Sequence, residues 1–244
     1  MLGWYTENIS TYAKDVDTLF ALIYWITVVV FILVMATLIL FLIKYRHREG
    51  HKAEYIEGST KLEIIWTTAT TVIVFGLAML SFPQWNKLKS PAENPDYTVL
   101  VRGEQFNWYF IYPGPDNKIG TEDDLEFENE MYVPEDKVIQ ILLTSKDVIH
   151  SFFVPELRLK QDALPNRIID FTKFRIDSTK LTKLITKKPD ETEPDETEPE
   201  VKRRYEIPCA ELCGFGHATM IGYLNVLTQE DYDSWVAENW PPQE

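Results

Sequence analysis

Residues 209–220 read CAELCGFGHATM, and these twelve positions hold two thiols, one imidazole and one thioether. All four groups are soft or borderline metal ligands, the kind of set that suits copper. The chain has only two cysteines, Cys209 and Cys213, and both stand in this stretch. Its four histidines are His47, His51, His150 and His217. The first two lie in a short basic segment between apolar runs. Two Cys, two His and Met220 can hold a pair of copper ions if the fold brings His150 alongside.

Three other interpretations of this stretch are a disulfide, a zinc site and a mononuclear copper site. Cys209 and Cys213 are four residues apart and could pair in a loop, but the nearby His and Met and the charged Glu211 would then have no role. Zinc prefers four Cys or His ligands and has little use for Met. A mononuclear blue-copper site takes two His, one Cys and a weak axial Met. The chain has one thiolate more, which two bridged copper ions would use.

The net charge of −14 is distributed unevenly over the 244 residues. Residues 1–95 hold eight acidic and eight basic side chains, whereas residues 96–244 hold 30 acidic and 16 basic ones. Phosphate binding needs positive charge, so we expect no nucleic-acid partner. A strongly acidic domain instead attracts a basic protein by long-range steering.

Two uncharged apolar runs, Leu19–Ile43 and Ile64–Phe82, are long enough to cross a membrane. A helix of the first run, at ~1.5 Å per residue, exceeds a hydrocarbon core of ~30 Å. The alternative is a signal peptide followed by a buried core helix. The first run is too long for the apolar region of a signal peptide and lacks a small-residue cleavage site. We expect a two-helix transmembrane hairpin, with helices over about 19–43 and 64–83, in a membrane-anchoring domain of residues 1–95.

Positive charge gathers between the two apolar runs. The basic residues there are Lys44, Arg46, Arg48, Lys52 and Lys61. The residues before the first run carry Lys14 alone, and the stretch after the second run carries Lys87 and Lys89. This excess predicts a cytoplasmic connecting loop, with both termini on the other side of the membrane. The two cysteines then lie in an oxidising compartment, where a disulfide is the default expectation for a Cys pair.

Residues 96–244 have the pattern of an all-β sandwich or barrel, reached through a linker that Pro83, Pro91 and Pro95 punctuate. Short runs rich in β-branched and aromatic residues predict strands at Thr98–Arg102, Asn107–Tyr112, Val138–Thr144, Ser151–Val154, Ile168–Ile176 and Ile221–Leu227. Residues 228–239 predict a short C-terminal helix with Thr228 as its N-cap.

Two acidic segments do not fit a compact sheet. Residues 120–130 read GTEDDLEFENE, and an acidic insert over about 178–201 ends in PDETEPDETEPE. The charge and proline of the insert predict an extended or disordered segment, with a docking arm or cation-binding segment as the alternative. Residues 114–124 loosely resemble a calcium loop, although an acidic hairpin turn explains the same Asp, Asn and Gly residues.

The stretch 209–220 resembles the binuclear CuA motif of cytochrome c oxidase subunit II, Cys-x-Glu-x-Cys-x3-His-x2-Met, with every position filled. Further ordered segments resemble the same family. They are EIIWT at 63–67, GEQFNWYF at 103–110, DVIHSFFVP at 147–155 and KQDALPNR at 160–167. The resemblance spans both apolar runs and the β domain apart from the acidic insert. It implies an extracytoplasmic, cupredoxin-like CuA domain on a membrane hairpin.

The resemblance implies a role for each matched residue. The implied CuA ligands are His150, Cys209, Glu211, Cys213, His217 and Met220, with Glu211 acting through its backbone carbonyl. The two cysteines would bridge both coppers as thiolates. His150 and Met220 would complete one copper, and His217 with the Glu211 carbonyl the other. The Glu211 carboxylate would reach a magnesium or manganese ion in the catalytic subunit.

The same resemblance implies paths for protons and electrons. Glu63 would stand at the cytoplasmic mouth of a proton path, although a carboxylate at a helix N-terminus is also favoured by the helix dipole. Phe106 and Trp108 would carry electrons in. Many relatives have Trp where this chain has Phe106, so coupling to a cytochrome c, or to a c-type domain of a partner complex, is expected to be altered.

The implied function is that of the subunit through which electrons enter a respiratory terminal oxidase. Electrons would pass from cytochrome c to binuclear copper and then to haem in subunit I, where oxygen becomes water and protons are pumped. This chain would carry electron transfer and not oxygen chemistry, and it lacks the Cys-x-x-Cys-His motif of covalent haem. The expected location is a respiratory membrane, the bacterial plasma membrane, with the CuA domain in the periplasm. The alternatives are the CuA subunit of a nitric oxide reductase and a membrane-tethered copper-binding protein.

Overall fold

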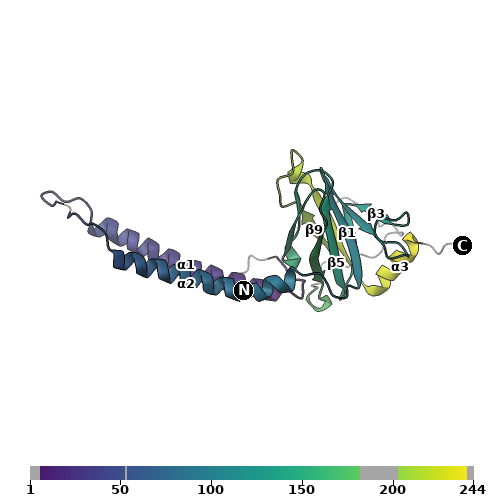
Figure 1. Cartoon of the computed structure of the whole chain (residues 1–244), viewed down its shortest axis with the longest axis horizontal. Coiled ribbons are helices and arrows are strands. Elements are labelled where there is room, and N and C mark those ends of the chain that lie inside the picture. Colours follow the sequence, from purple (N-terminus) through teal and green to yellow (C-terminus); the bar gives the residue numbers. More distant parts are fainter. Residues whose placement is uncertain (1–5, 53, 182–202, 241–244) are drawn as a thin grey trace. The chain divides into compact units, whose positions relative to one another are not determined.

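The computed structural model describes residues 6–52, 54–181 and 203–240 (Figure 1). The chain divides into two compact units. The helical unit is Asp15–Asn86, and the β unit combines the start of the chain, up to Lys14, with the residues from Lys87 onward. The residues around 6–14 and 87–95, which the sequence assigned to the membrane-anchoring domain, therefore belong with the β unit.

The helical unit consists of α1 (Ala13–Lys44) and α2 (Thr60–Leu88). Both are longer than expected, because an uncharged run marks only the apolar part of a helix, whereas polar residues at each end continue it. The prediction that the second helix ends at Pro83 is wrong, since Pro83 lies inside α2. Proline removes one backbone hydrogen bond there without ending the helix.

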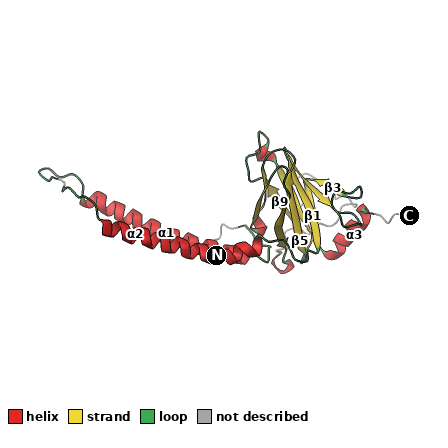
Figure 2. Cartoon of the chain, viewed as in Figure 1, coloured by secondary structure: helices red, strands yellow, loops and turns green. Residues whose placement is uncertain are grey.

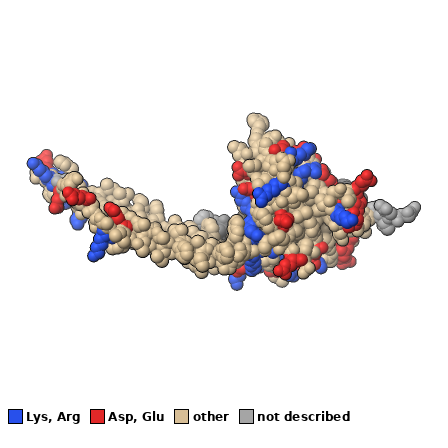
Figure 3. Space-filling view, in the orientation of Figure 1, with Lys and Arg blue, Asp and Glu red and all other residues tan. Residues whose placement is uncertain are grey.

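Both helices are apolar around their whole circumference. The side chains along their middle are exposed, and both helices are long and apolar enough to cross a membrane. Figure 3 shows a long stretch of this surface without Lys, Arg, Asp or Glu, with charges at the end that carries the connecting loop. A helix that is hydrophobic on all sides needs an apolar surrounding.

The β unit is a sandwich of antiparallel and parallel strands (Figure 2). In the described part of the chain, one sheet has the order β3-β2-β1-β5-β8, a second has β4-β10-β9, and β6 and β7 form a two-stranded ribbon. The first sheet comprises β1 (Tyr97–Glu104), β2 (Asn107–Tyr112), β3 (Leu125–Glu128), β5 (Val138–Ser145) and β8 (Ile169–Arg175). The others comprise β4 (Glu130–Pro134), β6 (His150–Val154), β7 (Leu159–Ala163), β9 (Arg203–Pro208) and β10 (Ile221–Leu227).

The core of the sandwich follows from period-two alternation along the strands. In β1, every second residue from Val99 is buried, and a bridge from Phe152 to Cys209 joins the β6–β7 ribbon to the end of β9. Buried apolar residues of both layers form one continuous cluster. A sheet whose alternate side chains pack into such a core is a stiff support for residues at the strand ends.

The prediction that residues 120–130 stay outside the sheet is wrong. Leu125–Glu128 form β3, which pairs with β2, and Glu130 opens β4. The acidic side chains of this segment alternate with Leu125 and Phe127, and Phe127 packs against the core. An edge strand needs only one apolar face. Because the other face of β3 is acidic, the sequence pattern did not indicate a strand there.

The remaining predictions concern the C-terminal helix and two acidic segments. Helix α3 (Gln229–Asn239) is confirmed, with the Thr228 side chain accepting from the Asp231 backbone N–H. Of the acidic insert, a short 3₁₀ turn, η2 (Ser178–Lys180), is described, and residues 182–202 lie outside the described part. In the loop at 114–124, Asp116 and Asp124 accept local backbone N–H groups, as in an acidic turn.

Candidate metal centre

The four soft ligands of the stretch 209–220 stand on a loop closed at its base. Cys209 follows β9, and Met220 precedes β10, the antiparallel neighbour of β9. The backbone N–H of Cys209 donates to the Met220 carbonyl at 3.0 Å, and that of Ala210 donates to Ser151 at 2.9 Å. The second bond ties the loop to β6, whose first residue is His150. Two neighbouring strand ends and a third strand thus set the positions of the ligands.

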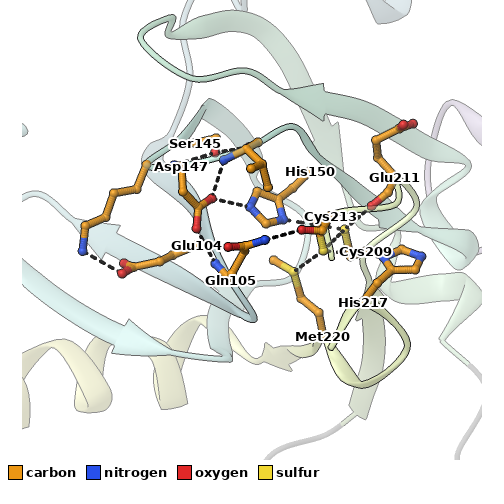
Figure 4. Close-up of polar contacts among 12 residues, drawn as sticks. Glu104, Gln105, Ser145, Asp147, His150, Cys209, Glu211, Cys213, His217 and Met220 are labelled. Carbon is orange, nitrogen blue, oxygen red and sulfur yellow. Dashed lines mark hydrogen bonds and ion pairs between the residues drawn. The ribbon is translucent and has the colours of Figure 1, made fainter. Parts of the chain in front are cut away.

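The ligand atoms come together from positions up to 70 residues apart, as Figure 4 shows. The two cysteine sulfurs lie 3.9 Å apart and both thiols are free. Cys209 Sγ lies 3.9 Å from His150 Nδ1, and Cys213 Sγ lies 3.6 Å from His217 Nδ1 and 3.8 Å from Met220 Sδ. The five side chains predicted as ligands therefore form one cluster, in which His150, His217 and Met220 lie around the two cysteine sulfurs.

Glu211 presents two different groups in two directions. Its backbone carbonyl lies 3.2 Å from Cys209 Sγ, whereas its side chain extends away from the cluster and is exposed (Figure 4). The carbonyl is thus available to the metal centre, and the carboxylate is available to a neighbour of this chain.

His150 is held in one orientation by its surroundings. Its Nε2 lies 2.8 Å from Asp147 Oδ1, and the ring is fully buried. An Nε2–H that donates to the carboxylate leaves a lone pair on Nδ1, the nitrogen that faces the sulfurs. Gly103 makes room for the ring, since a Cβ there would lie 2.8 Å from His150 Cδ2. Asp147 stands three residues before His150, so only its proximity in sequence hinted at this role.

The pKa values of the two thiols shift in opposite directions. Burial raises the pKa of the Cys209 thiol, but hydrogen bonds with His150 and the adjacent backbone prevail and lower it to about 6. Burial and the neighbouring Cys209 raise the pKa of Cys213 to about 11. A second thiolate this close to the first needs a cation to offset the repulsion. The donor set of two sulfurs, two imidazoles and a thioether fits soft-metal ions, copper above all.

The described residues offer no second place of this kind. Among them, His150, Cys209 and Cys213 are the one group of His, Cys, Asp or Glu side chains close enough to share a metal ion. The acidic loop at 114–124 is not such a group. His217 stands slightly apart, half-buried on the short 3₁₀ turn η3 (His217–Thr219), and it reaches the cluster through Cys213.

The aromatic residues expected to carry electrons lie on the side of the ligand loop that faces the core of the sandwich. Trp108 is fully buried, and its ring meets that of His150 edge to face, with centroids 6.0 Å apart. Phe106 is partly buried and packs against the core beneath Gly214 and Gly216. Gln105, which sequence reasoning did not single out, donates its side-chain N–H to the Cys213 carbonyl.

Glu63 lies in the helical unit, in the first turn of α2, and is exposed. The hydroxyl of Ser59, just before the helix, accepts from the Leu62 backbone N–H at 3.4 Å. A carboxylate in the first helical turn interacts favourably with the helix dipole. The helix dipole alone therefore explains a glutamate at position 63, whether or not Glu63 takes part in proton uptake.

Two family models match this chain. One, described as cytochrome c oxidase subunit II, periplasmic domain, matches residues 92–181. The other, described as cytochrome c oxidase subunit II, transmembrane domain, matches residues 5–84, so the two span more than half of the chain. The chain belongs to the cytochrome c oxidase subunit II family.

Curated subunit II proteins match along nearly the whole chain. Cytochrome c oxidase subunit 2 of Synechocystis is 29% identical over 98% of this chain and 78% of its own length. Alternative cytochrome c oxidase subunit 2 of Bradyrhizobium diazoefficiens is 28% identical over 96% and 84%. The crystal structure of the periplasmic domain of subunit II of cytochrome oxidase from Bradyrhizobium japonicum is 27% identical, with a TM-score of 0.44, over 60% of this chain and 94% of that one.

Membership in the subunit II family agrees with both units of the molecule. The two apolar helices are those of a membrane-anchored subunit, and the sandwich is its periplasmic-type, cupredoxin-like domain. The family implies a CuA copper site, electron transport, and other subunits of an oxidase complex as partners. The cluster around Cys209 and Cys213 is the place in the described residues that can hold such a site.

Proposed function

We propose that this chain is the subunit through which electrons enter a respiratory terminal oxidase. It takes electrons from a c-type cytochrome at a binuclear copper centre and passes them to haem in subunit I. Oxygen is reduced to water there, with protons pumped across the membrane. The observation that carries this proposal is the convergence of both cysteine sulfurs, two imidazoles, one thioether and one backbone carbonyl within 3.9 Å contacts.

Each contact supports a ligand role. The two thiolates would both hold the copper pair, which the 3.9 Å separation of their sulfurs allows. His150 and Met220 would hold one copper, and His217 with the Glu211 carbonyl would hold the other. A bound copper pair would supply one-electron chemistry. The chain itself shares the charge over two sulfurs and holds every ligand on a strand end or a closed loop.

The surrounding residues keep the ligand geometry fixed and the centre dry. Asp147 fixes the His150 ring, and Gln105 holds the carbonyl of Cys213. Both cysteines and Met220 are buried. A rigid ligand frame in an apolar shell reduces the rearrangement that accompanies a change in charge, which favours fast electron transfer.

Further roles follow from the family resemblance. The exposed Glu211 carboxylate would be available to a magnesium or manganese ion shared with subunit I, and Glu63 would open a proton path. The basic loop between the helices lies in the cytoplasm, and the sandwich faces the periplasm of a bacterium.

The test is electron paramagnetic resonance of the copper-loaded full chain in detergent. A delocalised copper pair gives a seven-line mixed-valence pattern in the wild type. Cys213→Ser removes one bridging sulfur and is expected to give the four-line pattern of a single copper. His150→Ala is expected to weaken the binding of one copper selectively. A four-line pattern in the wild type, or a Cys209–Cys213 disulfide that excludes copper, overturns the proposal.

A further inference from the structure

The exposed apolar side chains of the β unit gather at one end. Among the described residues of this unit, the large hydrophobic side chains that are exposed are Val148, Ile149, Ile168, Leu212 and Phe215. Two of them directly precede His150, and two lie on the ligand loop. Ile168 comes just before Ile169, which pairs with Leu143 near the same end of the sheet. The four exposed apolar residues that adjoin the ligands in the sequence, Val148, Ile149, Leu212 and Phe215, mark a place where another molecule binds, whereas Ile168 adjoins no ligand.

Phe215 is the most exposed of these residues. Its side chain is fully exposed, whereas the other four are between 38% and 77% exposed. It lies midway between Cys213 and His217, on the segment that projects from the end of the sandwich, drawn in yellow-green in Figure 1. An aromatic ring left in water buries no apolar area within this chain, and together with its exposed apolar neighbours it forms a surface of the kind that binds another molecule.

The backbone around Phe215 rests on Phe106. A Cβ at Gly216 would lie 2.5 Å from Phe106 Cδ2, and one at Gly214 would lie 3.1 Å from Phe106 Cε1. The loop therefore covers one side of the Phe106 ring and turns Phe215 outward. Trp108 lies deeper still and has no exposed surface. Of the aromatic residues nearest the ligands, Phe215 is the one a partner meets first.

The position of Phe215 also gives a short covalent connection to the centre. Phe215 stands two residues after Cys213 and two residues before His217. The carboxylates near this end have partners within the chain, since Glu104 pairs with Lys146, and Asp147 accepts from the Gln105 backbone N–H and lies against His150. The negative charge is a property of the whole domain, whose residues from 96 onward hold 30 acidic against 16 basic side chains. A small apolar contact on a domain of net negative charge suits a transient, basic protein partner.

We propose that Phe215 is the side chain through which the copper centre of this chain meets its electron donor, a c-type cytochrome of basic surface charge. Phe106 supports the loop from beneath, and Trp108 packs on His150 behind it. The proposal rests on the proposed function, because it presupposes that electrons arrive at this centre from a soluble or tethered donor.

The experiment uses the assembled oxidase complex that contains this chain. Oxidised complex is mixed with a reduced, basic, soluble c-type cytochrome, and the second-order rate constant is measured over a range of ionic strength. The variants are Phe215→Ala, Phe215→Tyr and the matched control Ile168→Ala. The control removes exposed apolar surface at the same end of the β unit, at a residue that adjoins no predicted copper ligand. Turnover with a small-molecule reductant, the copper resonance and co-purified haem are measured for each.

Loss of a central aromatic contact is expected to lower the rate constant about tenfold in Phe215→Ala, while Phe215→Tyr and Ile168→Ala stay within twofold of the wild type. Small-molecule turnover, the copper resonance and haem content remain unchanged in all three. Salt lowers the rate in the wild type and in Phe215→Ala alike, because the carboxylates remain.

Two results overturn the assignment of Phe215. One is a Phe215→Ala rate constant equal to that of Ile168→Ala. The other is loss of haem from Phe215→Ala preparations, which would make this face a contact with the catalytic subunit. A wild-type complex without a mixed-valence copper resonance is a different result, because it contradicts the proposed function itself before any variant is compared.

Discussion

The contact between Phe106 and the ligand loop shows how single residues define the centre. Gly214 and Gly216 let the loop backbone lie directly on the ring. Gly214 has a φ of +143°, which side chains rarely adopt, whereas Gly216 has a φ of −87°, open to any residue. At Gly216 the requirement for glycine is therefore steric and not conformational.

Gly216→Ala is expected to displace the loop or the ring and to weaken copper binding. Overpacking of this kind costs about 1–3 kcal/mol. The change is measured as earlier loss of the copper absorbance during titration with a chelator, and as a lower thermal midpoint of the copper-loaded chain.

The control is the double variant Gly216→Ala with Phe106→Ala. With the ring removed, the added methyl group has space, so its further cost is expected to fall below about 0.5 kcal/mol relative to Phe106→Ala alone. Equal costs in the two backgrounds would show that the glycine is needed for a reason other than the ring.

At the scale of elements, α3 completes the sandwich at the end of β10 remote from Met220. Its Trp235 is 3% exposed and stacks on Tyr132 of β4, with ring centroids 5.1 Å apart. Tyr112, Phe127 and Tyr232 surround the same indole. Aromatic clusters of this kind bury a large apolar area, so α3 is an integral part of the fold and not an appendage.

Trp235→Ala is expected to destabilise the β unit by about 3–5 kcal/mol, since it removes a large buried ring and leaves a cavity. The measurement is unfolding of the full chain in detergent by guanidinium, followed by far-ultraviolet circular dichroism. The copper resonance below the transition is expected to stay unchanged, because the ligands stand at the opposite end of β10.

The matched control for Trp235 is its exposed neighbour Ser234, whose hydroxyl donates to the Glu230 carbonyl at 3.0 Å. Ser234→Ala is expected to change stability by less than about 0.5 kcal/mol. A Trp235→Ala chain as stable as Ser234→Ala would mean that α3 does not contribute to the core.

At the scale of the whole molecule, the start of the chain packs onto the sandwich far along the sequence. Ile9 is fully buried, and its backbone N–H donates to the Glu156 carbonyl at 3.2 Å. Arg158 donates to the Thr6 carbonyl at 2.9 Å, and Ser10 bridges to Ile176 beside β8. The segment that leads into α1 is thus held by residues about 150 positions later.

In this contact, the carboxyl group of Glu156 lies in surroundings that disfavour its charged form. Burial raises the pKa of its carboxyl, and the nearby Glu206 and Glu7 add to the shift. Its buried Oε2 accepts no hydrogen bond among the described residues. Since the folded chain holds the proton more tightly than the unfolded chain, stability falls as the pH rises through the raised pKa.

Glu156→Gln is therefore expected to raise the thermal midpoint at pH 7 and to leave it unchanged at pH ~3, well below the ordinary glutamate pKa of ~4.3, where both side chains are neutral in the folded and the unfolded chain. Thermal unfolding of the full chain in detergent at the two pH values measures the difference. Glu206→Gln, the same change at an exposed neighbour, is the control and is expected to have the smaller effect at pH 7. The opposite order of the two variants would contradict the role of burial.

Much of the fold could be predicted from local patterns. The six strands expected from apolar and β-branched runs and the C-terminal helix all form, because each has a clear period of its own. The strands that were missed are β3, β4, β7 and β9. They include charged or polar edge segments such as Leu125–Glu128, whose single apolar face becomes useful only when β2 lies beside it.

The sequence by itself determined the chemistry of the centre and the presence of two apolar helices. The ligand types and their spacing within residues 209–220 are local properties, and so is the length of an uncharged run. The tertiary structure alone decided which residues meet. It brought His150 to Cys209, 59 residues away, buried Trp108, and left Phe215 in water. Such contacts depend on the pairing of β6, β9 and β10, and no periodicity within one segment encodes which distant strand ends become neighbours.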